Sequence, residues 1–296
     1  MIKIENVTKQ FEDTVALKDF TCVIQTSSIF GLLGPNGSGK STLMRSIAGV
    51  YKVDKGNISI DDRCIFDNPR EKQKIFYVPD NPYFSHDATL KNTASLYRNI
   101  YNTWNEKTFE KVQLAFPIPP TKKIVNMSKG MQRQAILIIA LSCRPKYLLL
   151  DEVFDGLDPI MRIKLKKMLI ELVTTNETTV LIASHNLREL EDICDSVGVM
   201  ENGGILLEND VELLKMNIHR IQIAFKSQVE QDVFKNLEIM NVTNRGLLYN
   251  IVVRGEETKI VEELKKLEPV FMEVLPLSLE EVFINEVEAT GYDSTI

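Results

Sequence analysis

The stretch Gly34-Pro-Asn-Gly-Ser-Gly-Lys-Ser-Thr42 decides the fold of this chain, because it joins a glycine-rich loop to a lysine and two hydroxyl residues. It follows the apolar run Ile29–Leu33 and precedes a helical pattern that begins near Lys40. Glycines let successive backbone N–H groups converge on phosphate oxygens, and the following helix adds the positive end of its dipole. Since the spacing matches GxxxxGK[ST], we expect this stretch to bind the phosphates of a nucleotide.

The side chains of this loop suit a nucleoside triphosphate bound together with Mg²⁺. Lys40 is expected to reach the β- and γ-phosphates of ATP, and the Ser41 hydroxyl is expected to ligate Mg²⁺. The alternative is a glycine-rich turn without a ligand, which the apolar run before the loop and the helical pattern after it disfavour. The residues expected to contact the nucleotide here are Asn36, Gly37, Ser38, Gly39, Lys40, Ser41 and Thr42.

A second motif is an apolar strand that ends in two carboxylates, Tyr147-Leu-Leu-Leu-Asp151-Glu152. A buried strand of this kind would carry Asp151 to the carboxyl edge of a parallel sheet, where α/β folds bind their ligands. There Asp151 can hold Mg²⁺, and Glu152 can orient or deprotonate the attacking water. Acidic residues at a strand end often serve only as a helix cap, but the loop at Gly34 favours the functional interpretation. Together the two motifs predict a P-loop nucleoside triphosphatase.

Short apolar runs alternate with helical patterns over the first two-thirds of the chain, which predicts an α/β sheet. The expected strands are Ile2–Ile4, Phe20–Ile24, Ile29–Leu33, Ile58–Ile60, Ile75–Val78, Tyr147–Leu150, Val180–Ala183 and Val197–Met200. The expected helices are Lys40–Ala48, Gly130–Ser142, Ile160–Thr174 and Leu187–Ile193. The runs that begin at Ile29, Tyr147 and Val180 are apolar throughout, as central parallel strands covered on both faces are.

Two further regions have patterns that differ from this alternation, one inserted in the first domain and one after it. The first domain is expected to span residues 1–215. Residues 90–116 are helical and aromatic, which predicts an inserted helical subdomain over residues 82–130. Residues 219–296 predict a small α+β domain of the ferredoxin-like βαββαβ type, with Leu279–Val287 as a closing helix. Its expected elements are the strands Ile221–Phe225, Ile239–Val242, Leu248–Val253 and Val270–Leu275 and the helices Val229–Leu237 and Thr258–Leu267.

Four shorter motifs narrow the class of P-loop protein. The ABC signature LSGGQ resembles Met127-Ser128-Lys129-Gly130-Met131-Gln132, and the D-loop of the same family resembles Gly156-Leu157-Asp158. The Q-loop resembles Tyr77-Val78-Pro79-Asp80, and the switch histidine resembles Ser184-His185. Each match is weak alone, but all stand in the family's order across residues 1–215. The chain therefore resembles the ATP-binding subunits of ABC transporters, which implies a cassette fold and ATP hydrolysis coupled to transport.

The resemblance implies a site that two chains share. In ABC ATPases two cassettes pack head to tail, and each nucleotide lies between the phosphate loop of one and the signature of the other. Ser128 and the backbone N–H of Gly130 would therefore contact the γ-phosphate held by the opposite chain, with Asp158 of the D-loop also at the nucleotide. The implied partners are a second ATPase subunit, identical or different, and an integral membrane permease.

Within one chain the resemblance implies roles for three more side chains. Glu152 would be the general base, and His185 would contact the γ-phosphate and the attacking water. Phe11 is an aromatic residue just after the first expected strand, and it would stack on the adenine. A core phenylalanine without contact to the nucleotide is the alternative for Phe11.

The sequence departs from the family's pattern at four positions. Asp80 replaces the usual Q-loop glutamine, so Mg²⁺ coordination there would use a carboxylate, and coupling to the membrane subunit would differ. Lys129 replaces the first signature glycine and Met131 replaces its glutamine. Val153 stands where a proline is common after the general base. Because the changes at Asp80 and Lys129 look like variants of bacterial exporter ATPases, hydrolysis is expected to survive.

Composition and charge limit the partners. The net charge is −6 and the pI is about 5.3, so the chain has no electrostatic attraction for nucleic acid or for an anionic membrane surface. The four cysteines form no CxxC pair, which fits reduced thiols better than disulfides or zinc. The sequence shows no secretory signal and no apolar run near the roughly 20 residues that span a bilayer. We therefore expect a chain at the cytoplasmic face of the cell membrane, held there by a permease.

The leading hypothesis is an ATPase subunit that powers export through a separate permease. The tail segment Leu277–Phe283 resembles the C-terminal extension of bacterial drug- and peptide-exporter ATPases, which suggests an antimicrobial or amphipathic peptide or a drug as substrate. The alternative is a soluble ABC ATPase acting on DNA or in translation, but such proteins usually have coiled coils, zinc cysteines or two cassettes. A nucleotide binder without hydrolysis would need to lack the base, and Glu152 is present.

Overall fold

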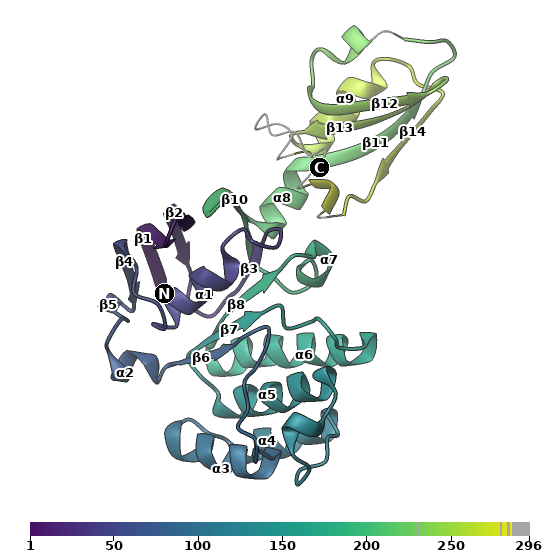
Figure 1. Cartoon of the computed structure of the whole chain (residues 1–296). Helices are drawn as coiled ribbons and strands as arrows, with labels where there is room; N and C mark the ends of the chain where they lie inside the picture. Colours follow the sequence, from purple (N-terminus) through teal and green to yellow (C-terminus); the bar gives the residue numbers. More distant parts are fainter. Residues whose placement is uncertain (230, 279, 283–284, 286–296) are drawn as a thin grey trace. The chain divides into compact units, whose positions relative to one another are not determined.

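The computed structural model describes residues 1–229, 231–278, 280–282 and 285, and the chain folds as two units (Figure 1). The first unit comprises residues 1–208, and the second begins at Asn209. The sequence placed the end of the first domain at residue 215. The division comes earlier because α8 (Val211–Asn217) contacts β11 (Ile218–Ala224) and so belongs to the second unit.

Two sheets form the first unit. The first sheet has the order β2-β1-β4-β5 and contains β1 (Ile2–Phe11), β2 (Thr14–Ile24), β4 (Lys55–Ile60) and β5 (Arg63–Cys64), with antiparallel pairs. The second has the order β10-β9-β3-β8-β7-β6 and contains β3 (Ile29–Leu33), β6 (Ile75–Val78), β7 (Tyr147–Asp151), β8 (Thr179–Ser184), β9 (Ser196–Glu201) and β10 (Gly204–Asp210). From β9 to β6 its pairs are parallel, so the carboxyl ends of β3, β8 and β7 meet at one edge.

The core of the first unit joins both sheets to α1 (Lys40–Ile47). Every residue of β7 and β8 is buried, as their apolar pattern predicted for central strands. The side chains that pack together from β1, β2, β3 and α1 include Ile2, Ile4, Phe20, Leu32, Leu43 and Ile47. This packing fixes α1 against the sheet and thereby fixes the loop that precedes it.

The remaining helices of the first unit are α2 (Pro69–Lys72), α3 (Leu90–Ile100), α4 (Glu106–Ala115), α5 (Lys129–Cys143), α6 (Pro159–Asn176) and α7 (Leu187–Leu190). Helices α3 and α4 contact α5 and form the helical region that the sequence predicted (Figure 1). The helical pattern of residues 90–116 is broken between α3 and α4, because Asn105 caps α4 by accepting a hydrogen bond from the Thr108 N–H at 2.8 Å.

Strands β1 and β2 are longer than the sequence predicted. β1 begins at Ile2 but runs to Phe11, and β2 begins at Thr14 rather than Phe20. The two strands pair as a hairpin with register shifts, and most of their outward residues are polar, so apolar runs mark only part of each strand. The helix predicted over Leu187–Ile193 ends at Leu190.

The second unit contains a four-stranded antiparallel sheet together with α8 and a further helix, α9. The sheet has the order β12-β13-β11-β14, and its further elements are β12 (Glu238–Arg245), β13 (Leu248–Arg254), α9 (Glu257–Lys265) and β14 (Phe271–Leu275). This matches the predicted ferredoxin-like order. The predicted helix Val229–Leu237 is only a 3₁₀ turn, Gln231–Phe234, because the Tyr249 hydroxyl bonds to both backbone groups of Val229. The closing helix predicted over Leu279–Val287 lies partly outside the described residues.

Candidate functional site

The phosphate loop lies between the end of β3 and the start of α1, at the carboxyl edge of the six-stranded sheet. Gly39 has a φ of 106°, and a Cβ there would lie 2.4 Å from the Ala16 carbonyl oxygen, so only glycine fits. Lys40 is 5% exposed and folds back over the loop, where its Nζ donates to the Gly34 carbonyl oxygen at 2.6 Å. The other predicted contacts of the nucleotide in the loop and the first turn of α1 are Asn36, Gly37, Ser38, Ser41 and Thr42.

Asp151 ends β7 and is 1% exposed. Its Oδ2 accepts a hydrogen bond from the Tyr77 hydroxyl at 3.0 Å. The Ser41 hydroxyl lies near enough to act on the pKa of this carboxyl, which it lowers. Burial raises the pKa of Asp151, so a nearby cation would favour its ionised form. The fold thus brings near each other Ser41 and Asp151, two of the three residues that the sequence predicted as ligands of Mg²⁺.

Glu152 follows β7 with a φ of 48° and is 9% exposed. Its backbone N–H donates to the Ala183 carbonyl oxygen of β8 at 3.0 Å. Its Oε1 lies 3.4 Å from Lys40 Nζ, and its Oε2 lies 2.9 Å from His185 Nδ1. The hydrogen bond with Glu152 raises the pKa of His185. The carboxylate therefore stands between the predicted phosphate lysine and the predicted switch histidine.

Among the described residues of the first unit, three buried side-chain oxygens lack a hydrogen-bond partner, and all three lie at this site: Ser38 Oγ, Asp151 Oδ1 and Glu152 Oε1. The Glu152 oxygen has only its ion pair with Lys40. Unsatisfied buried oxygens are rare, because each costs the free energy of its lost hydration. A nucleotide with Mg²⁺ and its waters would supply partners at this place, so the residues present fit that ligand.

Asp80, the predicted third metal ligand, follows β6. Its side chain points toward the guanidinium group of Arg133. Its Oδ1 lies 2.8 Å from Arg133 Nη2, and its Oδ2 accepts from the Asn81 side-chain amide at 2.8 Å. Burial is the main cause of the raised pKa of Asp151, and the Asp80 charge adds to it. Coordination of Mg²⁺ by Asp80 stays a prediction.

The predicted signature and D-loop residues begin two helices. Ser128 caps α5, and its Oγ accepts from the Met131 N–H at 3.3 Å. Asp158 caps α6 in the same way. Gly130 lies against the D-loop, since a Cβ there would be 2.8 Å from the Gly156 carbonyl oxygen. These residues form a second group, at the N-terminal ends of α5 and α6.

Phe11 lies at the end of β1 and is 40% exposed. Its ring contacts the edge of Tyr51 with 5.2 Å between centroids, and Lys9 Nζ lies 5.2 Å from its centroid. This exposure leaves ring surface available for a planar base and disfavours the alternative of a core phenylalanine. Stacking on adenine stays a prediction.

Three residues at the site have no role in the sequence reasoning. Tyr77 belongs to the Q-loop match, yet its bond to Asp151 depends on the pairing of β6 with β7. Arg133 donates to the backbone carbonyls of Glu152 and Asp80. Asp155 joins Glu152 and His185 in a group whose ligand atoms lie within 4.8 Å of one another. Asp155 carries a sequence signal of its own, since it follows the carboxylate pair closely.

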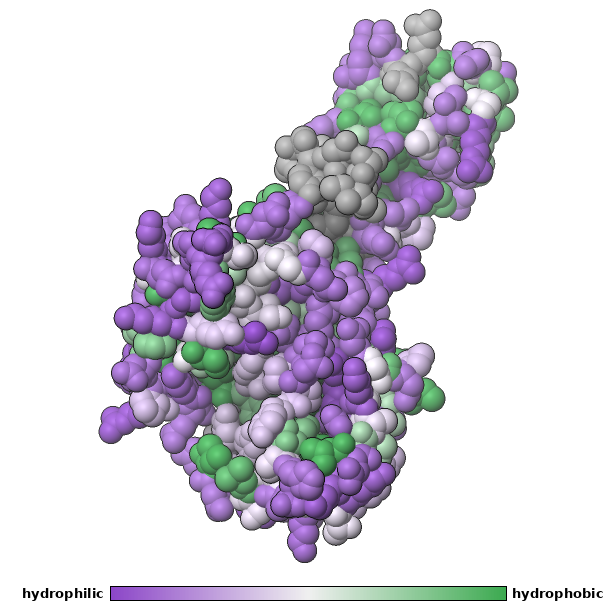
Figure 2. Space-filling view, viewed as in Figure 1, coloured by the Kyte–Doolittle hydropathy of each residue, from purple (hydrophilic) through white to green (hydrophobic). Residues whose placement is uncertain are grey.

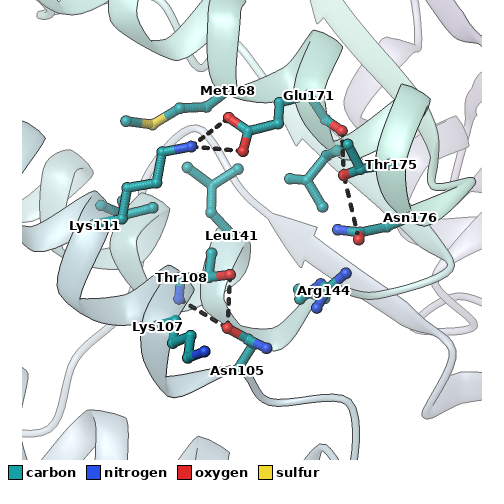
Figure 3. A pocket seen from close by; sticks show the side chains of 12 residues that line it. Asn105, Lys107, Thr108, Lys111, Leu141, Arg144, Met168, Glu171, Thr175 and Asn176 are labelled. Carbon is teal, nitrogen blue, oxygen red and sulfur yellow. Dashed lines mark hydrogen bonds and ion pairs between the residues drawn. The ribbon is translucent and has the colours of Figure 1, made fainter.

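A cavity of about 360 Å³ lies outside this group of residues, between α4, the end of α5 and α6 (Figure 3). The Lys111 ammonium pairs with the Glu171 carboxylate at 2.5 Å, and both residues line the cavity together with Leu141. None of the residues that the sequence predicted for nucleotide binding lines this cavity. The chemistry of the phosphate loop therefore lies at an open sheet edge and not in this pocket.

Comparisons with known proteins agree with this arrangement. A family model described as ABC transporter matches residues 17–155. The ABC transporter ATP-binding protein YtrB of Bacillus subtilis is 32% identical over 285 residues, which cover 96% of this chain and 97% of that protein.

Solved structures show the same fold. The structure of an ATP-binding subunit of an ABC transporter has a TM-score of 0.67 at 24% identity and covers 73% of this chain and 92% of its own. A dimeric ATP-binding cassette in a post-hydrolysis state, bound to ADP and Pi, has a TM-score of 0.64 at 23% identity. This likeness covers 71% of this chain and 99% of the cassette. Each of these likenesses covers more than two thirds of this chain.

Proposed function

This chain belongs to the ABC transporter family as an ATP-binding, ATP-hydrolysing subunit, and from that premise we propose that it powers export of a substrate through a separate membrane permease. In this family two ATP-binding subunits form a dimer, and the dimer works together with membrane permeases. The observation that carries the proposal is the convergence on Glu152 of Lys40 at 3.4 Å and His185 at 2.9 Å. These distances support the proposal of a base that lies between a lysine for the phosphates and a histidine for the same γ-phosphate.

In the proposed reaction each side chain has one task. Lys40 binds the β- and γ-phosphates, and Glu152 accepts the proton of the attacking water while His185 orients that water and the γ-phosphate. Ser41 and Asp151 would hold Mg²⁺, with Asp80 as a further candidate ligand, and the metal would neutralise charge on the phosphates. Phe11 would stack on the adenine, and Asn36, Gly37, Ser38, Gly39 and Thr42 would line the phosphates.

A second chain would complete the site. Ser128 and Gly130 start α5, and Asp158 starts α6, so free backbone N–H groups and the positive helix ends are available there to an anion. In a head-to-tail dimer these groups would face the γ-phosphate in the loop of the opposite chain. The partner subunit would be a second copy or a different ATPase.

The proposed attachment to the membrane is indirect, at its cytoplasmic face. No helix among the described residues has both the length and the apolar character needed to cross a bilayer. Apolar patches are visible over the region of α3 and α4 in Figure 2, and the exposed large hydrophobic residues of these helices are Leu96, Ile100 and Leu114. A permease loop covering this surface would remove apolar area from water.

For the substrate we propose an antimicrobial or amphipathic peptide or a drug. The support is the resemblance of Leu277–Phe283 to the tails of exporter ATPases, and part of that segment lies outside the described residues. The alternative of an ABC ATPase acting on DNA or in translation is disfavoured by the net charge of −6 and by the transporter relative that aligns over nearly the whole chain. Vesicles that hold the chain with its permease would distinguish export from import by the direction of substrate movement.

Two variants test the proposed roles. Glu152→Gln should bind ATP but hydrolyse it about 10²- to 10⁴-fold more slowly, because the general base is lost while the phosphate loop stays intact. Lys40→Ala should lose ATP binding itself. Binding is measured by calorimetry, turnover by phosphate release, and dimer formation with ATP by size-exclusion chromatography, where Glu152→Gln should form a lasting dimer.

Glu110→Gln, a change on the exposed face of α4, is the matched control and should leave both ATP binding and turnover unchanged. Normal turnover by Glu152→Gln together with a monomer in ATP would refute its role as base. Normal ATP binding by Lys40→Ala would refute the loop assignment.

A further inference from the structure

Arg133 is a buried arginine, 9% exposed, on the helix that begins with the signature. Its Nη1 donates to the backbone carbonyl oxygen of Glu152. Its Nη2 donates to the backbone carbonyl oxygen of Asp80 and lies 2.8 Å from Asp80 Oδ1. One planar guanidinium group therefore joins the loop after β6 to the residue that follows β7.

The charge of this arginine is balanced by a single carboxylate among the described residues. A buried guanidinium is stable only when its hydrogen bonds are satisfied and an anion lies near it. Asp80 provides that anion, and it stands where the family usually has a neutral glutamine. Its own side chain is 44% exposed, so water can solvate Asp80 without Arg133, whereas Arg133 has no such substitute.

The contact with Glu152 is the functionally important one. Glu152 has a φ of 48°, so its backbone is held in the left-handed region by its neighbours. Its carbonyl oxygen is fixed by Arg133 and its N–H by the Ala183 carbonyl oxygen. Because both backbone groups are held, the direction of the side chain toward His185 is also held.

We propose that Arg133 is a positioning residue for the catalytic glutamate and that Asp80 acts through it, as the anion that orients the guanidinium. The inference rests on the proposed role of Glu152 as base. In this arrangement a movement of the loop that contains Asp80 changes the orientation of Glu152 through one shared group. The acidic residue at the Q-loop position thereby has a task that differs from holding Mg²⁺.

The experiment is a double-mutant cycle on the full-length chain with Asp80→Asn, Arg133→Gln and the pair of changes together. Each single change should lower the kcat for ATP hydrolysis by about 10- to 100-fold, as a small misplacement of a catalytic group does. KM for ATP should stay within about twofold, because Lys40 and the loop are untouched. The double variant should be no slower than Arg133→Gln, since residues that act through one another are not additive.

If Arg133→Gln does not fold stably, Arg133→Lys provides a second test of the proposal. Lysine retains the charge that pairs with Asp80, but a single ammonium cannot reproduce the planar fork that reaches Glu152 and Asp80 together. Its thermal stability should be near that of the unchanged chain while its kcat falls. A purely structural role of Arg133 would give the opposite pattern, a normal kcat at lowered stability.

The control is a second arginine–carboxylate pair with the same separation, Arg98 and Glu106, whose atoms lie 2.8 Å apart between α3 and α4. Arg98→Gln and Glu106→Gln should leave kcat unchanged. Hydrogen–deuterium exchange adds a measurement without turnover: amides of residues 152–157 should exchange faster in Asp80→Asn and Arg133→Gln and at the normal rate in the control variants.

Two results would overturn the inference. Additive losses in the double variant would show that Asp80 and Arg133 act separately. A higher Mg²⁺ concentration for half-maximal activity in Asp80→Asn, with Arg133→Gln unaffected, would assign Asp80 to the metal instead. Failure of the proposed function would give a different result, normal turnover by Glu152→Gln. Failure of the present inference would appear in the double-mutant cycle of Asp80 and Arg133.

Discussion

Glu152 illustrates how neighbours define the task of a single carboxylate. Alone it would be an acidic residue at a strand end, but its Oε1 meets Lys40 and its Oε2 meets His185. These two contacts hold the carboxylate between the lysine and the histidine. Phosphates bound in the loop would compete for Lys40 and weaken its ion pair with Glu152. The carboxylate would then be free to accept a proton from a water molecule.

The pair of His185 and Glu152 predicts a pH dependence. The hydrogen bond with Glu152 raises the pKa of His185 above its usual value near 6.5, so the charged pair persists to higher pH than a free histidine would. The pair stabilises the fold fully below the unfolded pKa, and this contribution is lost as pH rises through the raised pKa. Since a paired Glu152 is not free to act as base, kcat should rise over the same window.

Proton NMR can follow this titration, because the chain has only three histidines. In Glu152→Gln the pKa of His185 should fall back toward its usual range. His185→Gln should remove the rising limb of the kcat profile. An unchanged His185 titration in Glu152→Gln would mean that another group raises it.

At the same scale, the phosphate loop shows what the sequence could predict. Lys40 and Ser41 lie in a contiguous motif whose geometry is local, so their placement follows from spacing. The bonds of Tyr77 to Asp151 and of Arg133 to Glu152 join residues from different elements. Such pairs depend on strand order and helix packing, which a single sequence does not display.

Among the elements, strands with uniform burial were predictable and strands with mixed faces were not. The strands β3 and β6 have the predicted bounds, because continuous apolar runs leave no doubt where they begin and end. β1 and β2 alternate between the core and water and carry bulges, so their length was underestimated. In the second unit the order of strands was predictable, but the first helix was not, since Tyr249 holds the backbone of Val229.

Helix α5 carries the packing of the helical region, and a core substitution there should show its cost. Leu137 is fully buried, so Leu137→Ala should lower the free energy of unfolding by about 2 to 5 kcal/mol through lost burial and the cavity left behind. Leu114→Ala on α4 is the matched control, because Leu114 is 83% exposed and should change stability by less than about 0.5 kcal/mol. Urea unfolding followed by fluorescence of Trp104, the only tryptophan, measures both. Equal effects of the two changes would contradict the burial of α5.

At the scale of the whole molecule, the residues that the sequence predicted for the nucleotide fall into two groups on different elements. The first group surrounds Lys40 and Glu152 at the edge of the sheet, and the second starts α5 and α6 at Ser128 and Asp158. Sequence could predict both groups by resemblance, but the way in which two chains bring them together depends on a surface that spacing does not describe. The proposed sharing of the site between two chains must therefore be tested on an assembly and not on one chain.

Mixed dimers that combine Lys40→Ala with Ser128→Arg test whether each nucleotide site is shared by two chains. If each nucleotide lies between the loop of one chain and the signature of the other, placing the two changes on different chains damages one site and spares the second, so the dimer retains one of its two ATP molecules. Placing both changes on one chain, paired with an unchanged partner, damages both sites and should abolish trapping. Differently tagged chains in the Glu152→Gln background allow the bound ATP to be counted. Sites formed within single chains would reverse the outcome: the dimer with both changes on one chain would keep one ATP, and the other dimer would keep none.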